Sequence, residues 1–306
     1  MEIIEKVVTE NEEGKRFDAV VSMLNDKISR TLAQDLIKDG IILLDGAKAK
    51  ETAKVRVGQV ITMPEEYNTK PAENLVAEDI DIDILYEDED IIVVNKPKDM
   101  VVHPAVGNWT GTLVNAMLGK HELSDENGEF RPGIVHRLDK NTTGVMVVAK
   151  NNNAHNVLSK QIQEHSFKKI YIALVKGVIA ENEAIIEMPI GRHPTDRKKM
   201  AVVKDGREAY TKFKVLERFE KFTLVEVELK TGRTHQIRVH MSHIGYPIVG
   251  DDTYSNGKNP FGITSQMLHS KTLGITHPVT NEYMEFNAPL PEEFEDVLNK
   301  LRNNEV

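Results

Sequence analysis

Short runs of apolar residues, separated by turns, recur along the last two thirds of the chain and constrain its fold most. Five of them have the length of ordinary strands, at 91–95, 144–150, 169–176, 210–219 and 222–230. Several alternate apolar with polar residues, which is the pattern of an antiparallel sheet with one wetter face. No run approaches the roughly 20 apolar residues of a membrane-spanning helix. We therefore expect a large α+β domain from residue 85 onward.

Two segments among these strands have helical spacing instead. The first runs from about Asn152 to His165 and repeats apolar residues at intervals of three and four. The second starts near Thr234 and stops before Gly245, with apolar and polar residues on opposite sides. Its apolar side would hold Ile237, Met241 and Ile244, and its polar side Thr234, His235, Arg238 and Ser242.

The first sixty residues predict a smaller unit of two helices and a hairpin. Residues 16–24 have helical spacing, and a second helix follows, with Ser29 as its N-cap and Gly40 just past its end. An apolar strand at 41–44, the turn pair Asp45-Gly46 and a strand around residues 60–61 complete the unit.

This unit resembles the alpha-L RNA-binding module first known from a ribosomal small-subunit protein. The resemblance covers residues 15–62, with Asp-Gly at the turn where the family usually has Asn-Gly. It rests on Arg16-Phe17-Asp18, Ser29-Arg30, Ile37 to Gly40, Asp45-Gly46 and Val57-Gly58. The alternative is a small α/β module with scattered lysines.

Residues 63–84 are predicted to be an acidic linker between the two domains. The alternation of aspartate and isoleucine at 79–83 lacks the central glycine and closing glutamate of a calcium loop, so we expect an exposed strand or spacer there.

The net charge of −9 conceals a strongly uneven distribution. Residues 65–90 hold eleven carboxylates against one lysine, whereas 131–176 hold eight bases against two acids. Residues 192–240 hold thirteen bases against seven acids, and 15–56 nine against six. The basic segments are compatible with an RNA partner, or with solvated faces if they do not share one surface.

The chain contains no cysteine, which excludes disulfides, thiolate nucleophiles and thiolate metal sites. Its N-terminus is acidic and lacks the basic start and apolar stretch of a secretory signal. We therefore expect a cytoplasmic protein.

The stretch 131–150, RPGIVHRLDKNTTGVMVVAK, carries the densest chemistry. Asp139 is its one carboxylate, and His136, Arg137 and Lys140 flank it. Neighbouring positive charge favours the ionised form of a carboxylate, which suits nucleophilic or electrostatic work. A loop held by salt bridges and leading into a strand would explain the same residues.

Two later segments add candidate residues. Tyr171 lies within 168–174, KKIYIAL, where a tyrosine packed in the core is an equally ordinary explanation. Arg238 lies within 231–240, TGRTHQIRVH. The histidines at 235, 240 and 243 lack the spacing and the glutamate of a helical zinc site, so we expect no metal there.

Together these segments resemble the signatures of the RluA family of pseudouridine synthases. The family motif reads His-Arg-Leu-Asp followed by Thr-Ser-Gly, and this chain has His136-Arg137-Leu138-Asp139, then Thr142-Thr143-Gly144. The threonine in the usual serine position is the departure. Further matching stretches lie at 86–97, 102–104, 250–254 and 268–270, so the resemblance spans residues 85–290 in family order.

The resemblance implies a pseudouridine synthase fold over residues 85–302, with a mixed, mainly antiparallel central sheet, flanking helices and a central cleft. It implies that Asp139 is the catalytic carboxylate, that Arg238 pairs with it, and that Tyr171 stacks on the target base. Arg137 would fill the space left by the flipped nucleotide. His136, Arg137, Arg233 and Arg30 are the predicted RNA-binding residues, and neither cofactor nor metal is required.

The resemblance also implies large-subunit ribosomal RNA as substrate, since an attached alpha-L module is typical of that branch, including the RluD type. We expect a monomer that binds a stem-loop and no membrane. The alternatives are the same reaction on transfer RNA, a noncatalytic RNA-binding or ribosome-assembly factor, and a glycoside or nucleoside hydrolase. A hydrolase usually needs a carboxylate pair, and no second acid lies near Asp139 in the sequence.

Overall fold

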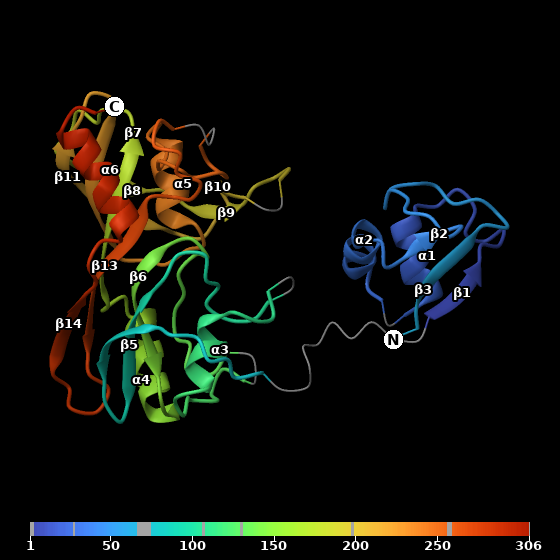
Figure 1. Cartoon of the computed structure of the whole chain (residues 1–306), viewed down its shortest axis with the longest axis horizontal. Helices are drawn as coiled ribbons and strands as arrows, with labels where there is room; N and C mark the ends of the chain where they lie inside the picture. The colour runs from blue at the N-terminus through green and yellow to red at the C-terminus, as the bar shows by residue number, and fades with distance from the viewer. Residues whose placement is uncertain are drawn as a thin grey trace. The chain divides into compact units, whose positions relative to one another are not determined.

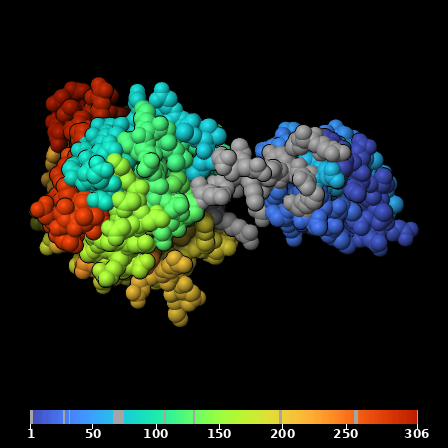
Figure 2. All heavy atoms as spheres, turned by 90° about the horizontal axis from the view of Figure 1, so that it is seen from below, coloured from blue at the N-terminus to red at the C-terminus, as the bar shows by residue number. Residues whose placement is uncertain are grey.

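The computed structural model describes residues 3–26, 28–65, 75–105, 108–128, 131–196, 199–255 and 259–305. The chain forms two compact units, Met1–Glu73 and Asn74–Val306. They are coloured from blue to cyan and from cyan to red in Figures 1 and 2, and each is described by itself below.

The first unit packs two helices against a three-stranded antiparallel sheet of order β1-β3-β2. Its elements are β1 (Ile3–Val7), α1 (Phe17–Leu24), α2 (Arg30–Asp39), β2 (Leu43–Leu44) and β3 (Val60–Pro64). The core is small and apolar, with fully buried Phe17, Val20, Val21 and Ile61 among its members.

The helix boundaries of this unit follow the capping residues seen in the sequence. The Ser29 hydroxyl accepts a hydrogen bond from the Leu32 amide at 3.3 Å, and Gly40 ends α2 with a φ of 78°. The predicted strand 41–44 is shorter than expected, because the amides of Ile41 and Ile42 still bond the Leu36 carbonyl at the helix end. The strand β1 had no prediction.

The second unit is built on a nine-stranded sheet of described residues, with order β4-β5-β6-β13-β7-β12-β11-β8 and β14 paired to β13 (Figure 1). The pair β6–β13 is parallel and the other recorded pairs are antiparallel, which confirms the predicted mixed, mainly antiparallel sheet. The strands are β4 (Asp83–Glu87), β5 (Ile91–Lys96), β6 (Thr143–Ala149), β7 (Lys168–Lys176), β8 (Glu183–Glu187), β11 (Tyr210–Arg218), β12 (Phe222–Leu229), β13 (Leu268–Thr276) and β14 (Tyr283–Asn287).

Both faces of β5 and β6 are covered, because alternate residues of a strand point to opposite faces. On one face Ile92 and Met146 belong to the largest core cluster, which also takes in residues of α3 (Leu113–Leu118), α5 (Gln236–His243) and α6 (Glu292–Arg302). On the other face Ile91 and Val145 pack in a cluster with residues of α4 (Asn152–Gln163). A separate hairpin of β9 (Ile190–Arg192) and β10 (Met200–Val202) lies beside α5 (Figure 1).

The five predicted strands and the two predicted helices of this unit are present, with ends displaced by one to two residues. The central strand β13 had no prediction, because its sequence LHSKTLGIT places buried His269 and Ser270 where an apolar run would be expected. Within the segment predicted as a linker, 66–74 lies outside the described residues. Residues 75–82 belong to the second unit, where Leu75, Ile80 and Ile82 pack on its core. Among the described residues no helix combines the length and apolar character needed to cross a membrane.

Candidate active site

The loop that carries Asp139 is anchored from inside the protein by His136. The Nε2 atom of His136 accepts a hydrogen bond from the Val147 amide at 3.0 Å, and its ring contacts Phe167 edge-on. Burial, aided by the charge of Lys169, lowers the pKa of His136 to about 4. This histidine, predicted to bind RNA, is therefore neutral, bonds the backbone of β6 and is not among the residues that line the pocket described below.

Lys96 anchors the same loop from β5. Its ammonium donates hydrogen bonds to the carbonyls of Pro97, Met100 and Lys140, at 2.8, 2.8 and 3.0 Å. Burial lowers the pKa of Lys96 to about 7, against the opposing charges of Asp139 and Asp99. Because Lys140 follows Asp139 directly, this lysine fixes the backbone beside the candidate carboxylate.

The register of the central sheet brings the end of this loop next to Tyr171. Gly144 on β6 pairs with Ser270 on β13, and Ser270 pairs with Tyr171 on β7. At Gly144 φ is 110°, and a Cβ atom would lie 2.1 Å from the Ser270 carbonyl oxygen. Only glycine fits this approach, which gives a physical reason for the Thr-Thr-Gly sequence after Asp139.

Arg238 joins two carboxylates that are far apart in sequence. Its Nη1 lies 3.0 Å from Asp139 Oδ2, while Nε and Nη2 bind Asp251 at 2.7 and 3.0 Å. Burial alone would lower the pKa of Arg238. The hydrogen bonds and charges of both aspartates outweigh this effect and raise the pKa above its ordinary value. The guanidinium is thus permanently charged and held in one orientation.

Asp251 is a site residue that the sequence prediction missed. Its carboxylate is fully buried and accepts hydrogen bonds from Arg238 and from the amides of Thr253 and Tyr254. The sequence feature that could have identified Asp251 is its position in segment 250–254, one of the stretches that match the family. Since its lone pairs are occupied, Asp251 orients Arg238 and cannot act as the second acid that a hydrolase needs.

Tyr171 is buried in the middle of the sheet with its ring at the floor of a depression. Burial raises the pKa of Tyr171 to about 12, while a hydrogen bond with Ser270 acts in the opposite direction. The side chain therefore stays a neutral phenol and offers an aromatic surface.

The depression is open to solvent, and its empty volume of about 550 Å³ includes the solvent space at its mouth. It is lined by Arg137, Leu138, Asp139, Thr142, Tyr171, Leu229, Gly232, Arg233, Thr234, His235, Gln236, Ile237, Arg238 and Leu268. Five predicted site residues thus meet in one pocket, and Asp139 is the carboxylate among the described residues that line it. Arg30 belongs to the first unit, where its Nε lies 3.4 Å from Asp18.

The basic side of the pocket is shaped by Gln236, which the sequence prediction also missed. Its Oε1 accepts hydrogen bonds from the Thr231 hydroxyl at 2.8 Å and the Arg233 amide at 2.9 Å. Its Nε2 donates to the Tyr210 carbonyl at 2.9 Å, so the buried amide ties the loop 231–235 to β11. Nearby, burial and the charge of Arg233 lower the pKa of Lys169 to about 8.

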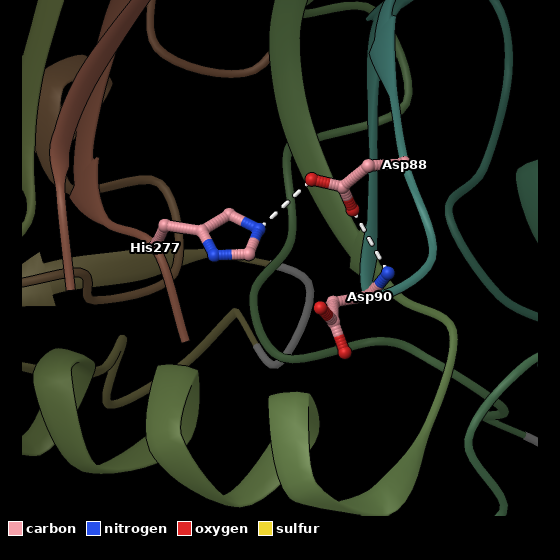
Figure 3. Close-up of side chains that lie close together, drawn as sticks. All are labelled: Asp88, Asp90 and His277. Atoms are coloured by element: carbon pink, nitrogen blue, oxygen red, sulfur yellow. Dashed lines mark hydrogen bonds and ion pairs between the residues drawn. The ribbon is translucent and has the colours of Figure 1, made fainter. Parts of the chain in front are cut away.

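Two other groups of polar residues could suggest a metal site. Asp88, Asp90 and His277 lie together (Figure 3), but His277 Nδ1 accepts from the amides of Val279 and Thr280. Its Nε2 therefore carries the proton and donates to Asp88 at 2.9 Å. In α5, His240 bonds Thr211 and the Met188 carbonyl through its two nitrogens. Neither histidine has a nitrogen lone pair free for a cation.

The arrangement can hold a flat, uncharged ring against Tyr171 and present an oriented carboxylate to it. Comparison with known proteins agrees with such a substrate. The model of the family described as RNA pseudouridylate synthase matches residues 90–243. The uncharacterized RNA pseudouridine synthase YlyB of Bacillus subtilis is 45% identical over 99% of this chain and 100% of its own length. Ribosomal large subunit pseudouridine synthase D of Pseudomonas aeruginosa is 43% identical over 95% of this chain and 93% of its own.

Two solved human structures share the fold of the second unit. RNA pseudouridylate synthase domain containing 1 aligns with a TM-score of 0.57 and 27% identity, over 74% of this chain and 96% of its own. The domain containing 4 protein aligns with a TM-score of 0.57 and 26% identity, over 72% and 93%. The chain therefore belongs to the RluA family of RNA pseudouridine synthases and is an isomerase that converts uridine in RNA to pseudouridine.

Proposed function

We propose that this enzyme modifies uridines of large-subunit ribosomal RNA and that Asp139 is its catalytic carboxylate. The observation that carries the assignment is the 3.0 Å ion pair between Asp139 and Arg238 in a pocket floored by Tyr171. The guanidinium holds the carboxylate in a fixed orientation before the base arrives.

The target uracil must leave its helix to reach this pocket, because the glycosidic bond is inaccessible in stacked RNA. Tyr171 stacks on the extruded ring, a contact worth about 1–3 kcal/mol per base. Arg137 is exposed at the pocket and adjoins Asp139 in the chain, a placement that suits it to occupy the space the nucleotide leaves. Arg233 and Lys169 add positive charge for the RNA backbone.

In the reaction the bond from the sugar to N1 of uracil breaks and a bond from the sugar to C5 forms. C5 loses a proton and N1 carries one in the product, so the atoms balance without an oxidant or a donated group. Asp139 starts this sequence as the nucleophile or base, and Arg238 stabilises the negative charge that Asp139 carries before this step and regains at the end. Tyr171 stays neutral, which avoids a second anion beside Asp139.

The ribosomal substrate is supported by the name of the Pseudomonas aeruginosa relative, which is similar over nearly its whole length. It is also supported by the first unit, which we assign as an alpha-L RNA-binding module over residues 15–62, with Arg30 among its RNA contacts. A stem-loop is the proposed target, since RNA is read most specifically at unpaired bases. We place this monomeric, metal-independent enzyme in the cytoplasm, where such RNA would be available.

Asp139→Asn tests the catalytic assignment. The change keeps the size of the side chain and removes its charge, so turnover should fall by about 10²–10⁴-fold or more while RNA binding persists. The measurement is tritium release from RNA labelled at C5 of uracil, with binding followed by filter retention. Asp205→Asn, an exposed aspartate away from the pocket, is the matched control. Wild-type release by Asp139→Asn would refute the assignment.

The substrate is tested by mapping pseudouridines in cells with and without the protein. We expect sites in large-subunit ribosomal RNA to disappear and to return on expression of the wild type but not of Asp139→Asn. If the lost sites lie in transfer RNA instead, the ribosomal proposal is wrong while the catalytic assignment stands.

A further inference from the structure

His235 occupies an unusual position at the start of α5. It is the N-cap residue, yet its side chain makes no capping bond and its φ is 57°. This left-handed conformation is rare for residues with a side chain, and it persists only where surrounding contacts impose it. Here it turns the imidazole into the pocket, with Nε2 3.9 Å from Asp139 Oδ1.

The other ring nitrogen of His235 is engaged by Tyr254. Nδ1 and the Tyr254 hydroxyl oxygen are 2.8 Å apart, and the two rings meet edge-on. The same hydroxyl oxygen accepts a hydrogen bond from the Met200 amide at 2.8 Å. Met200 begins β10, so three segments distant in sequence meet at this tyrosine.

The Met200 amide limits where the protons can lie between Tyr254 and His235. A backbone amide can only donate, so the Tyr254 oxygen is an acceptor toward Met200. The hydroxyl proton is then free to be donated to His235 Nδ1. When the hydroxyl donates to Nδ1, the one proton of a neutral imidazole resides on Nε2 and faces the Asp139 carboxylate.

We propose that His235 is a positioning residue for the isomerase reaction. Its Nε2–H holds Asp139 Oδ1 while Arg238 holds Oδ2, and Tyr254 fixes the tautomer that makes this arrangement available. The distance of 3.9 Å is long for a hydrogen bond, but such contacts often tighten only when the substrate is bound. The inference rests on the proposed role of Asp139.

Burial favours the neutral form of His235, and the surrounding charges act in both directions. Asp139 and Asp251 act to raise its pKa, Arg238 and Arg137 act to lower it, and Tyr254 contacts it directly. Burial is the largest influence and the net effect lowers the pKa of His235. A proton added at Nδ1 removes the lone pair that accepts the Tyr254 hydroxyl, so that hydrogen bond is lost when His235 becomes charged.

The inference is tested with His235→Ala, His235→Gln and Tyr254→Phe in the full-length enzyme. His243→Gln, an exposed position on the same helix, is the matched control and should behave as wild type. The probe is unmodified ribosomal or transfer RNA transcript labelled with tritium at C5, whichever the wild type modifies. Rates are measured from pH 5 to pH 9, and thermal unfolding checks that each variant is folded.

His235→Ala should lower kcat on the order of tenfold with KM changed by less than about twofold, because orientation and not binding is lost. His235→Gln keeps an N–H donor and should recover most of kcat. It should also lose the decline in rate toward low pH that protonation of His235 causes. Tyr254→Phe should lower kcat less than His235→Ala does, since the tautomer is freed but the ring remains.

The proposal is overturned if His235→Ala turns over at the wild-type rate, or if alanine and glutamine are equally impaired with an unchanged pH profile. If His235→Ala does not fold, Tyr254→Phe decides, and wild-type kcat in that variant overturns the proposal. Asp139→Asn is run in parallel. Activity in Asp139→Asn removes the proposed function itself, whereas an inactive Asp139→Asn with a normal His235→Ala removes only the present inference.

Discussion

The two carboxylates that bind Arg238, Asp139 and Asp251, have different surroundings. The Asp251 side chain is fully buried and receives backbone amides as well as the guanidinium, whereas the Asp139 side chain remains 19% exposed toward the pocket. A carboxylate saturated with donors cannot react, and one that keeps free lone pairs can. In the proposed reaction the two aspartates therefore divide the work, with Asp251 orienting Arg238 and Asp139 acting on the substrate.

Asp251→Asn should destabilise the protein by about 3 kcal/mol, the order expected when one partner of a buried ion pair is removed. It should also lower kcat, because Arg238 would no longer be aimed at Asp139. Urea unfolding and tritium release measure the two effects. Asp252→Asn is the control, since that side chain is 75% exposed and lies 4.0 Å from Arg238, so its loss should be small. Equal stability of the two variants would contradict the role given to Asp251.

At the scale of elements, the central strand β13 combines buried histidine and serine with the parallel contact to β6. His269 Nε2 donates to the Ala288 carbonyl at 3.4 Å, so its Nδ1 accepts from the Thr143 hydroxyl at 2.8 Å. The bond to Thr143 joins β13 to β6 at the end of the loop that carries Asp139, and the bond to Ala288 joins β13 to the residue that follows β14. They require a neutral imidazole, and burial lowers the pKa of His269 to about 4.

Stability should therefore fall as the pH drops from about 6.5 to about 4. In this window the unfolded chain binds a proton at His269 that the folded protein does not, so acid favours unfolding. The contribution of this one histidine is up to about 3 kcal/mol. Urea unfolding at pH 7 and pH 5 measures it in wild type and in His269→Gln, which keeps an amide in place of the titrating ring. A pH dependence that is the same in both proteins would show that His269 does not contribute.

For the whole molecule, each of the two units has its own apolar core. The cluster around Phe17 and Ile61 lies within the first unit, and the larger clusters lie within the second. All residues that line the pocket belong to the second unit. The chemistry and the proposed RNA-binding module are therefore separable in principle.

Residues 74–306 alone should fold and keep turnover that depends on Asp139. Their KM for RNA should be higher than that of the full chain, and should depend less steeply on salt, because phosphate contacts of the first unit are lost. Steady-state rates between 50 and 200 mM salt measure this. If the shortened protein has the KM and salt dependence of the full chain, the first unit does not contribute to RNA binding.

Local patterns were enough to predict seven strands and four helices, and the resemblance to the family signatures supplied five of the residues that meet in the pocket. Apolar–polar alternation, helix caps and the motif around Asp139 involve only residues that are close together in the chain. Such patterns can be read directly from the sequence. The strands β8, β13 and β14 are among those not predicted, because polar residues interrupt their apolar runs, and β8 and β13 also pair with strands that are distant in the sequence. The sequence also did not predict the contributions of Lys96, Gln236 and Asp251, because each acts through hydrogen bonds to remote segments.

By itself, then, the sequence determined the α+β character of the larger domain and the residues able to do chemistry, since both follow from side-chain type and local spacing. Only the tertiary structure decided which of them meet. Sheet register set Gly144 beside Ser270 and Ser270 beside Tyr171, and Arg238 was turned toward Asp139 by a buried Asp251. The tertiary structure also placed His136 against the backbone of β6 and His235 in the pocket. The contacts of a histidine depend on remote segments, which sequence spacing does not encode.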